Sequence, residues 1–343
     1  MGKVQVGING FGRIGRITFR AIVENFADTL EVVAINDLAP VATNAHLLKH
    51  DTNYGGFKGT VEVAEDAIVV NGKAVTICKE KDPANLPWAA LGVDIVIEST
   101  GFFTDADKAA AHIAAGAKKV IISAPAKGDG VQTIVLGVND ADLDVKAYNV
   151  FSNASCTTNC LAPLAKALDE LWGIEHGFMN TIHSYTNDQR MNDQVHSDMR
   201  RARAGAANII PTTTGAAKAI GLVMPHLKGK LDGCSLRVPT PTVSVVDLTA
   251  ELKRDLPVGA DGKIDLKAVK AALKAKCDGK YLGYSDEEPV SSDFRGDPRS
   301  SVLDVEFTYA IAPRGIKVLS WYDNEWGYSN RLAELCEKIA EQL

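Results

Sequence analysis

Short apolar runs alternate with amphipathic stretches along the first 125 residues. Apolar runs bounded by turn residues are typical of buried strands, and apolar positions three or four residues apart are typical of helices. Strands joined by helices predict parallel βαβ units with right-handed crossovers. The predicted strands are Val4–Ile8, Val32–Ile35, Asp94–Glu98, Lys119–Ser123, Thr133–Val138 and Ala147–Phe151, and the predicted helices are Arg16–Phe26, Pro40–Lys49 and one capped by Thr104 or Asp105 that runs to Ala115.

Three short β-type runs interrupt this alternation, at Thr60–Val63, Ile68–Val70 and Ala74–Ile77. Asn71 and Gly72 separate the last two runs, and both residue types tolerate the positive φ that two-residue hairpins require. We therefore expect an antiparallel excursion within an otherwise parallel sheet.

The second half of the chain has longer β-type runs and fewer helices, which predicts a mixed or antiparallel sheet with helices on one side. From Ser184 to Ala207 the chain is polar and rich in arginine, and a long irregular segment of this kind is either disordered or functional. The predicted strands are Ser235–Val238, Val243–Glu251, Val302–Ile311 and Ile316–Trp321, and the predicted helices are Cys156–Glu170, Gly215–Leu222, Leu266–Lys276 and the amphipathic Tyr328–Leu343.

Composition narrows the class of protein. A length of 343 residues suggests about two domains. The net charge of −6 argues against a dedicated nucleic-acid binder, which is usually strongly basic. No apolar run approaches the roughly 18 residues of a membrane span. The first residues lead into a strand rather than a signal peptide, so we expect a cytoplasmic protein whose six cysteines are reduced.

A dinucleotide-binding fingerprint, Gly10-x-Gly12-x-x-Gly15, follows the first predicted strand and opens the first predicted helix. Its glycines permit a tight turn, close approach of a pyrophosphate and close packing of helix on strand, and the phosphates bind at the helix N-terminus. Asp37 follows the second strand, where an acidic residue accepts hydrogen bonds from the ribose hydroxyls. The alternative is a glycine-rich turn beside a solvated aspartate.

Cys156 is a candidate nucleophile, because it lies among Ser, Thr and Asn at the start of a predicted helix. A helix N-terminus lowers the pKa of a thiol and favours the reactive thiolate, whereas the alternative is a buried structural cysteine. Cys160, one turn further along, is expected in the core. The two cysteines could also bind a metal, but nothing nearby completes a four-ligand set, so no metal is expected.

His183 is the candidate base among seven histidines, because it lies at a predicted strand end before the arginine-rich segment. A Cys–His pair would hold thiolate and imidazolium together and supply a general acid and base. His112, on an alanine-rich helix, is the alternative with only a structural role. A thiolate beside a nicotinamide cofactor predicts aldehyde oxidation through a hemithioacetal and a thioester.

Several arginines and threonines could bind phosphate, through bidentate contacts, hydroxyl groups and the N–H groups at the start of a helix. The alternative for the arginines is a solvated face or a subunit contact. The candidates are Arg200, Arg201, Arg203, Arg237, Thr186 and the run Thr212–Gly215.

Distinctive motifs occur in order over essentially the whole chain, in Asn9–Arg16, Ser152–Pro163, His183–Thr186, Arg200–Ala204, Ile210–Lys218, Arg237–Pro241 and Trp321–Asn330. Together these segments resemble the phosphorylating glyceraldehyde-3-phosphate dehydrogenases. The most specific of them is Ser-Cys-Thr-Thr-Asn-Cys-Leu-Ala-Pro, which begins at Ser155.

The resemblance implies roles for individual residues. Cys156 matches the catalytic nucleophile and His183 the base that activates it, while Thr186 and Arg237 match the residues that hold the C3 phosphate of the substrate. The surroundings of the inorganic phosphate or the acyl carbonyl match Ser155, Thr157, Arg201, Thr214 and Gly215. The positions that touch NAD match Gly10, Gly12, Arg13, Ile14, Gly15, Asp37, Lys81, Ser123 and Asn324, where Lys81 aligns with a position that also holds arginine.

The resemblance also implies an architecture and an assembly. The fold is α/β, with a Rossmann-type parallel-sheet domain over residues 1–151 that a C-terminal helix over 324–343 completes. An α+β catalytic domain with a mixed or antiparallel sheet covers residues 152–323. Members are typically homotetramers, in which an S-loop, here residues 184–207, reaches a neighbour's cofactor site.

The expected cofactor is NAD, because Asp37 would bind the ribose and repel the 2′-phosphate of NADP. Gln194 and Val195 stand where NAD-specific relatives often carry Leu-Pro, so dual use of NAD and NADP stays open. The implied reaction is the oxidative phosphorylation of glyceraldehyde 3-phosphate to 1,3-bisphosphoglycerate.

Three other functions are alternatives to this reaction. They are the same chemistry on erythrose 4-phosphate, a semialdehyde dehydrogenase, and a non-catalytic NAD- or RNA-binding protein on the same fold. The expected partners are the triose phosphate, inorganic phosphate and further copies of this chain, with no membrane and with nucleic acid not the main partner.

Overall fold

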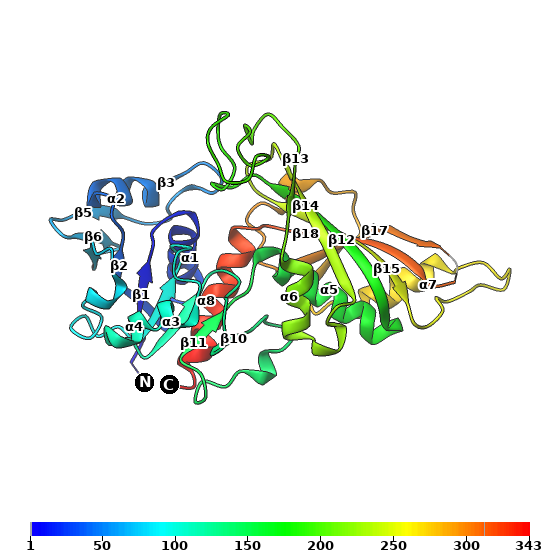
Figure 1. The fold of residues 1–343 in the computed structure, drawn as a ribbon, viewed down its shortest axis with the longest axis horizontal. Helices are drawn as coiled ribbons and strands as arrows, with labels where there is room; N and C mark the ends of the chain where they lie inside the picture. Colours follow the sequence, from blue (N-terminus) through cyan, green and yellow to red (C-terminus); the bar gives the residue numbers. More distant parts are fainter. Residues whose placement is uncertain (1, 312) are drawn as a thin grey trace. The chain divides into compact units, whose positions relative to one another are not determined.

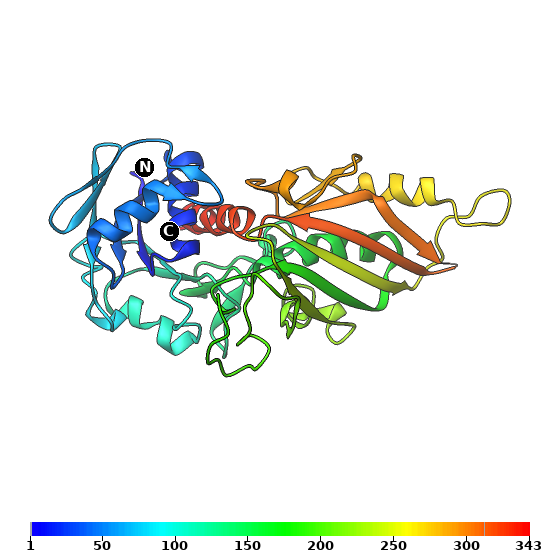
Figure 2. The ribbon, with the colours of Figure 1, turned by 90° about the horizontal axis from the view of Figure 1, so that it is seen from above.

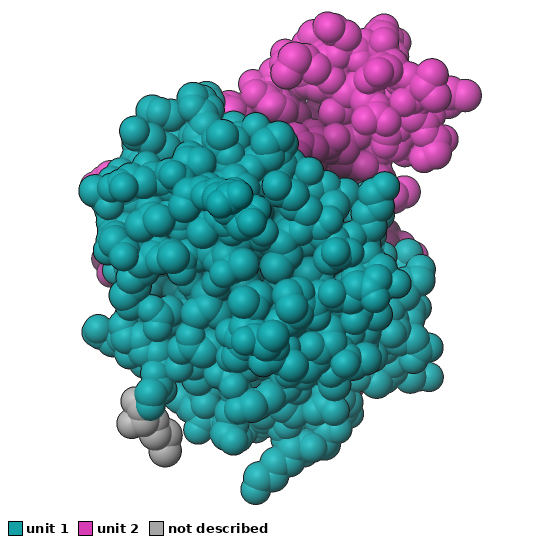
Figure 3. All heavy atoms as spheres, turned by 90° about the vertical axis from the view of Figure 1, so that its left-hand side faces the viewer, with its two compact units in different colours: residues 1–134, 140–155, 329–343 teal, residues 135–139, 156–328 magenta. Residues whose placement is uncertain are grey.

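The computed structural model describes residues 2–311 and 313–343, and these divide into two compact units, which Figure 3 shows in different colours. Unit 1 comprises the chain up to residue 134, residues 140–155 and residues 329–343, and unit 2 comprises residues 135–139 and 156–328. These limits differ from the expected domain limits, because residues 135–139 and 324–328 belong to unit 2 and residues 152–155 to unit 1.

Unit 1 is built on a nine-stranded sheet in the order β10-β11-β9-β8-β1-β2-β7-β6-β5 (Figure 1). Neighbouring strands are parallel from β10 through to β7, whereas β6 is antiparallel to both of its neighbours, β7 and β5. This confirms both the parallel sheet and the antiparallel excursion. The strands are β1 (Val4–Asn9), β2 (Leu30–Asn36), β5 (Val61–Val63), β6 (Ala67–Val70), β7 (Lys73–Cys78), β8 (Ile95–Glu98), β9 (Lys119–Ile122), β10 (Val131–Thr133) and β11 (Val150–Ser152), with β3 (His50–Asp51) and β4 (Gly55–Gly56) forming a separate pair.

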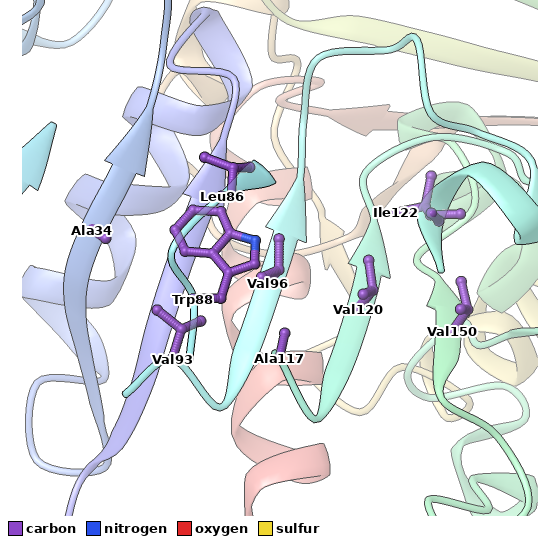
Figure 4. Packing of buried hydrophobic residues seen from close by; sticks show 10 residues of the cluster. Ala34, Leu86, Trp88, Val93, Val96, Ala117, Val120, Ile122 and Val150 are labelled. Atoms are coloured by element: carbon purple, nitrogen blue, oxygen red, sulfur yellow. The ribbon is translucent and has the colours of Figure 1, made fainter. Parts of the chain in front are cut away.

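The predicted hairpin turn lies between β6 and β7. Asn71 and Gly72 have φ values of 51° and 79°, the two positive angles that its sequence favours. One apolar cluster beside this sheet consists of small and branched residues together with Trp88, whose ring lies among Leu86, Val93 and Val96 (Figure 4).

The helices of unit 1 flank its sheet. The first begins earlier than predicted, at Arg13, because the carbonyl of Gly12 already accepts a hydrogen bond from Arg16 N at 3.0 Å. The helix predicted up to Ala115 is instead two short helices, of which the first is capped by Asp105. The helices are α1 (Arg13–Asn25), α2 (Val41–Lys49), α3 (Ala106–Ala109) and α4 (Ala111–Ala114), with 3₁₀ turns at η1 (Pro83–Asn85) and η2 (Asp140–Asp142).

The predicted strand Thr133–Val138 is wrong over most of its length. Beyond Thr133 the chain forms a turn, in which the side chain of Asn139 accepts a hydrogen bond from Val135 N at 2.8 Å. Ile134, Val135 and Leu136 are fully buried. Burial therefore produced an apolar run that resembles a strand.

Unit 2 contains a seven-stranded mixed sheet in the order β13-β14-β12-β15-β18-β17-β16. Helix α5 packs against β15, β17 and β18 and also contacts α6 and α7, so the three helices form one layer, as predicted (Figure 2). The strands are β12 (Ile174–Ser184), β13 (Ile210–Thr213), β14 (Leu231–Val238), β15 (Ser244–Leu252), β16 (Leu282–Ser285), β17 (Ser301–Ile311) and β18 (Gly315–Tyr322), and the helices are α5 (Cys156–Trp172), α6 (Ala216–Val223) and α7 (Leu266–Lys274), with η3 (Pro225–Leu227) and η4 (Ser291–Phe294).

The predicted S-loop, residues 184–207, follows β12 and contains no helix or strand beyond Ser184. Hydrogen bonds within the segment hold it, including Gln194 N to Ala202 O at 2.9 Å and Gly205 N to Arg190 O at 2.8 Å. The segment is therefore irregular but internally connected.

Helix α8 (Trp326–Ala340) contributes residues 329 onward to unit 1. There Asn25 donates to Asn330 Oδ1 at 2.9 Å and Thr29 donates to Glu337 Oε1 at 2.6 Å. Among the described residues, no helix has both the length and the apolar character that a membrane crossing requires.

Candidate active site

The three fingerprint glycines of unit 1 have different surroundings. A Cβ atom on Gly10, which has a φ of 90°, would lie 2.7 Å from Thr100 N, and one on Gly15 would lie 2.1 Å from Gly10 O. Among the described residues, leaving out the two chain neighbours of Gly12, no atom lies within 4 Å of the position of a Cβ on Gly12. The turn is thus closed on the side of the sheet and open at Gly12, at the N-terminus of α1, where free N–H groups attract phosphate. The geometry fits a dinucleotide.

Asp37 lies beside this turn. Its Oδ2 accepts a hydrogen bond from Phe11 N at 2.9 Å, and its Oδ1 accepts one from Ala39 N at 2.9 Å. The carboxylate that sequence analysis assigned to the ribose is therefore held at the fingerprint, at the end of β2.

The other candidate cofactor residues fall into two groups. Arg13 and Ile14 form the first turn of α1, where Arg13 pairs with Asp51 at 2.5 Å, while Ser123 follows β9 and the exposed Lys81 follows β7. Asn324, in contrast, belongs to unit 2. Its Oδ1 accepts hydrogen bonds from Ser184 Oγ at 2.9 Å and Ser244 Oγ at 3.0 Å.

Unit 2 brings the candidate nucleophile and base together. Cys156 is the first residue of α5, and its Sγ lies 3.5 Å from Nε2 of His183 in β12. His183 Nδ1 lies 2.7 Å from Ser184 O, which only accepts, and 2.8 Å from Arg237 NH1, which only donates. Nε2 faces the thiol, and in the tautomer that carries its proton on Nδ1 it can accept the thiol proton.

Burial controls the electrostatics of this pair. It raises the pKa of the Cys156 thiol, and the nearby charge of Arg237 only partly opposes it. It lowers the pKa of His183 to about 3, and Arg237 lowers this pKa further in the same direction. The expectation that the helix N-terminus gives Cys156 a lowered pKa is therefore wrong, because desolvation is the larger effect. Both shifts disfavour the charged forms of the pair, a thiolate and an imidazolium.

Arg237 lies beside His183 because the two residues face each other in the register of parallel strands β12 and β14. Its NH1 donates to Ser184 O at 3.0 Å, and its buried Nε has no hydrogen-bond partner among the described residues. A buried guanidinium edge of this kind is suited to an oxyanion.

The predicted arginine cluster is only partly assembled. Arg201 donates from Nε to Thr212 Oγ1 and from NH1 to Asp188 Oδ2, both at 2.7 Å. Arg200 and Arg203 are exposed, and Arg203 pairs with Asp193 at 2.9 Å.

The candidate phosphate hydroxyls differ in their present partners. Thr186 Oγ1 donates to Gln189 Oε1 at 3.3 Å, and Thr214 Oγ1 accepts from Ala216 N at 3.2 Å beside Gly215, the N-cap of α6. Ser155 is half-buried next to Cys156.

Thr157 is engaged differently. Its Oγ1 lies 2.9 Å from the hydroxyl of Tyr322, which also lies 2.8 Å from Thr181 Oγ1. Sequence reasoning missed Tyr322, whose ring packs edge-on against His183 with centroids 6.0 Å apart. Its only sequence signal was its place within the Trp321–Asn330 motif.

Cys160 lies in the core, as predicted. It is fully buried, and burial raises its pKa to about 12, so the thiol is unreactive. No group of three or more metal-ligating side chains occurs among residues 2–311 and 313–343.

The parallel sheet with its open fingerprint, together with the thiol–imidazole pair, defines an NAD-dependent oxidoreductase. Two family models match: "Glyceraldehyde 3-phosphate dehydrogenase, NAD binding domain" over residues 4–106 and "Glyceraldehyde 3-phosphate dehydrogenase, C-terminal domain" over residues 155–324. The chain belongs to the glyceraldehyde-3-phosphate dehydrogenase family.

Curated relatives agree with this assignment. The chain is 55% identical over 342 residues to glyceraldehyde-3-phosphate dehydrogenase of Geobacillus stearothermophilus. It is 54% identical over 343 residues to glyceraldehyde-3-phosphate dehydrogenase 2 of Streptomyces avermitilis. Each alignment covers 99% of both chains.

Proposed function

We propose that this chain catalyses the NAD-dependent oxidative phosphorylation of glyceraldehyde 3-phosphate to 1,3-bisphosphoglycerate. The observation that carries the proposal is the 3.5 Å approach of Cys156 Sγ to His183 Nε2 beside the buried, unpartnered Nε of Arg237. Residues 1–134, 140–155 and 329–343 would form the NAD-binding domain, and residues 135–139 and 156–328 the catalytic domain.

The first steps need one nucleophile and one base. His183 Nε2 takes the thiol proton, and the thiolate of Cys156 attacks the aldehyde carbon. Return of the proton to the new alkoxide gives a hemithioacetal. NAD, when bound, supplies an acceptor for the hydride on that carbon. As the carbonyl re-forms, His183 takes the hydroxyl proton, which leaves a thioester on Cys156.

Inorganic phosphate completes the cycle. A phosphate oxygen attacks the thioester carbonyl, the C–S bond breaks, and Cys156 leaves as a thiolate with the acyl phosphate as product. The low pKa of His183 means that its protonated ring readily gives up the proton it took, to the Cys156 thiolate or to water, and this restores the neutral base for the next turnover.

Two groups of residues would hold the phosphates. Arg237 and Thr186 bind the C3 phosphate, for which the unpartnered Nε of Arg237 is the strongest support. The hydroxyl of Thr157 already contacts Tyr322. Thr157 would therefore bind the inorganic phosphate through its backbone N–H in the first turn of α5, where N–H groups have no partner within the helix. The inorganic phosphate is assigned to Ser155, Thr157, Arg201, Thr214 and Gly215.

The cofactor contacts would come from Gly10, Gly12, Arg13, Ile14, Gly15, Asp37, Lys81, Ser123 and Asn324. We expect NAD to be preferred over NADP, because Asp37 lies at the fingerprint and a carboxylate repels a 2′-phosphate. Comparing kcat/KM for the two cofactors tests this, and a preference for NADP would contradict it.

The assembly we propose is a cytoplasmic homotetramer in which residues 184–207 reach a neighbouring subunit. In support, Met191, Val195 and Met199 of this segment are 85%, 89% and 83% exposed, which is unusual for apolar side chains. Analytical ultracentrifugation should give a tetramer, and a fully active monomer would contradict the assignment.

The decisive experiment on the reaction measures NADH formation from glyceraldehyde 3-phosphate with and without phosphate or arsenate. We expect turnover only when one of these oxyanions is present. Strong turnover of erythrose 4-phosphate with little of the triose would point to the sister reaction, and loss of the oxyanion requirement would exclude a phosphorylating mechanism.

A further inference from the structure

A row of buried polar side chains crosses the parallel sheet of unit 1 at the fingerprint turn. Asn36, Asn9 and Glu98 end strands β2, β1 and β8, and they face one another in the register of the sheet. Asn36 Nδ2 donates to Asn9 Oδ1 at 2.7 Å, and Asn9 Nδ2 donates to Glu98 Oε2 at 2.5 Å. Glu98 is 1% exposed, so these contacts replace its solvation by water.

Two aromatic residues extend the row. Trp88 Nε1 donates to His112 Nδ1 at 2.9 Å, and His112 Nε2 lies 3.0 Å from Glu98 Oε2. Because an indole N–H can only donate, Nδ1 of His112 must carry a lone pair and the ring proton must lie on Nε2. Trp88, which is fixed in the apolar cluster of Figure 4, thus sets His112 as a donor to Glu98.

The Glu98 carboxylate has a donor for each of its four lone-pair positions. Oε2 accepts from Asn9 and His112, while Oε1 accepts from Thr100 N at 2.8 Å and from Thr100 Oγ1. An ionised carboxylate accepts from all four donors. An amide at this position would instead place its own NH₂ group against two of these donors.

The row connects the loops that follow three strands. The Thr100 N atom held by Glu98 is the atom that a Cβ on Gly10 would approach to 2.7 Å, and Ser99 Oγ donates to Gly10 O at 2.6 Å. At the other end, Asn36 donates to Glu80 O at 2.9 Å and accepts from Glu80 N at 2.8 Å, next to Lys81. Loops at the carboxyl ends of parallel strands are where dinucleotides bind.

We propose that Glu98 is a positioning residue for the dinucleotide: oriented by His112, its carboxylate holds the Gly10 turn against the Thr100 loop in the shape that receives the pyrophosphate. The inference rests on the proposed cofactor site. Simple electrostatics gives the opposite expectation, because removing a negative charge from this unit should favour an anionic ligand.

The test is Glu98→Gln, with Glu334→Gln as the matched control. Glu334 is another buried carboxylate of unit 1, paired with Arg331 at 2.9 Å on α8. Titration calorimetry measures the Kd for NAD, steady-state kinetics gives kcat at saturating NAD, and thermal unfolding monitors stability.

Glu98→Gln should raise the Kd for NAD about tenfold, the size of effect expected for one lost charge-assisted hydrogen bond. Its kcat at saturating NAD should stay within about twofold, because the thiol–imidazole pair is untouched. The control should lower stability and leave the Kd unchanged. A Glu98→Gln variant with equal or tighter NAD binding would overturn the proposal.

If Glu98→Gln does not fold, two variants of His112 test the same row. His112→Gln can still donate to Glu98 and accept from Trp88, whereas His112→Leu can do neither. NAD should bind more weakly to the leucine variant than to the glutamine variant, and equal binding by both would contradict the positioning role. Failure of the unmodified protein to bind NAD would instead contradict the cofactor assignment.

Discussion

Units 1 and 2 build their candidate chemistry from different parts of the chain. In unit 1 the key groups are backbone N–H groups at an open glycine turn, within one short segment, Gly10–Gly15. In unit 2 they are side chains from α5, β12 and β14, and His183 meets Arg237 through strand register. A binding site made of backbone groups can be recognised from one short segment of the sequence. A site made of side chains from several elements depends on how distant strands pair.

Cys156→Ser should give the largest effect that distinguishes the role of unit 2 from that of unit 1. Loss of the nucleophile should lower kcat at least about a thousandfold, since a serine hydroxyl beside a neutral imidazole is a far weaker nucleophile than the thiolate. NAD binding, measured by calorimetry, should be unchanged. Residual activity above about a tenth of the original would remove Cys156 from its proposed role.

A pair of glycine variants acts on unit 1 instead. Gly15→Ala places a Cβ 2.1 Å from Gly10 O, so the fold must shift, at a cost of about 1–3 kcal/mol in unfolding free energy. The Cβ of Gly12→Ala would meet no atom within 4 Å among the described residues beyond its chain neighbours, so the melting temperature should stay unchanged. The same Cβ would fill the space that the pyrophosphate needs.

We therefore expect both glycine variants to lose NAD affinity, by about tenfold or more, with only Gly15→Ala losing stability. Alkylation of Cys156 by iodoacetamide should proceed at the original rate in Gly12→Ala. Normal NAD binding by Gly12→Ala would mean that the open side of the turn is not where phosphate binds.

Arg237→Gln tests the anion site of unit 2. Removing a buried guanidinium from a charged hydrogen-bonded contact costs about 2–5 kcal/mol, so KM for the triose phosphate should rise at least about thirtyfold. The matched control is Arg314→Gln, an exposed arginine of unit 2 that pairs with Glu251 at 3.3 Å and should change KM by less than about twofold. Equal effects in the two variants would exclude a specific role for Arg237.

The smallest effect concerns acid stability. Burial lowers the pKa of His183 from its ordinary 6.5 to about 3, so between these values the unfolded chain binds a proton that the folded protein does not. Stability is therefore lost as the pH falls through this window. His183→Asn should flatten the decline of melting temperature between about pH 6.5 and 4 relative to the original chain. An unchanged slope would show that this histidine does not titrate as described.

Sequence predicted unit 1 more accurately than unit 2. Strands β1, β2, β8 and β9 are buried on both faces and so appear as continuous apolar runs. Most of β12 escaped prediction because polar residues on its exposed face and Gly177 hide its periodicity, although it lies within the unit 2 sheet.

Prediction of the candidate site from sequence was incomplete for a similar reason. The residues at the fingerprint and the identity of Cys156 and His183 were accessible from motifs. The raised pKa of Cys156, the contact of Thr157 with Tyr322 and the pairing of Arg203 with Asp193 were not. Each of these depends on burial or pairing in three dimensions, which the spacing of residues along the chain does not encode.

Helix α8 is divided between the two units at residue 329, and because it lies at the end of the chain it is synthesised last. Residues up to 328 supply all of unit 2, but unit 1 is complete only after Leu332, Leu335 and Ile339 have been added and buried. The ribosome therefore delivers Cys156 and His183 before it delivers the last buried apolar residues of the cofactor-binding unit. A chain interrupted within this helix would carry Cys156, His183 and Arg237 beside an unfinished NAD-binding unit, with apolar surface open to chaperones and proteases.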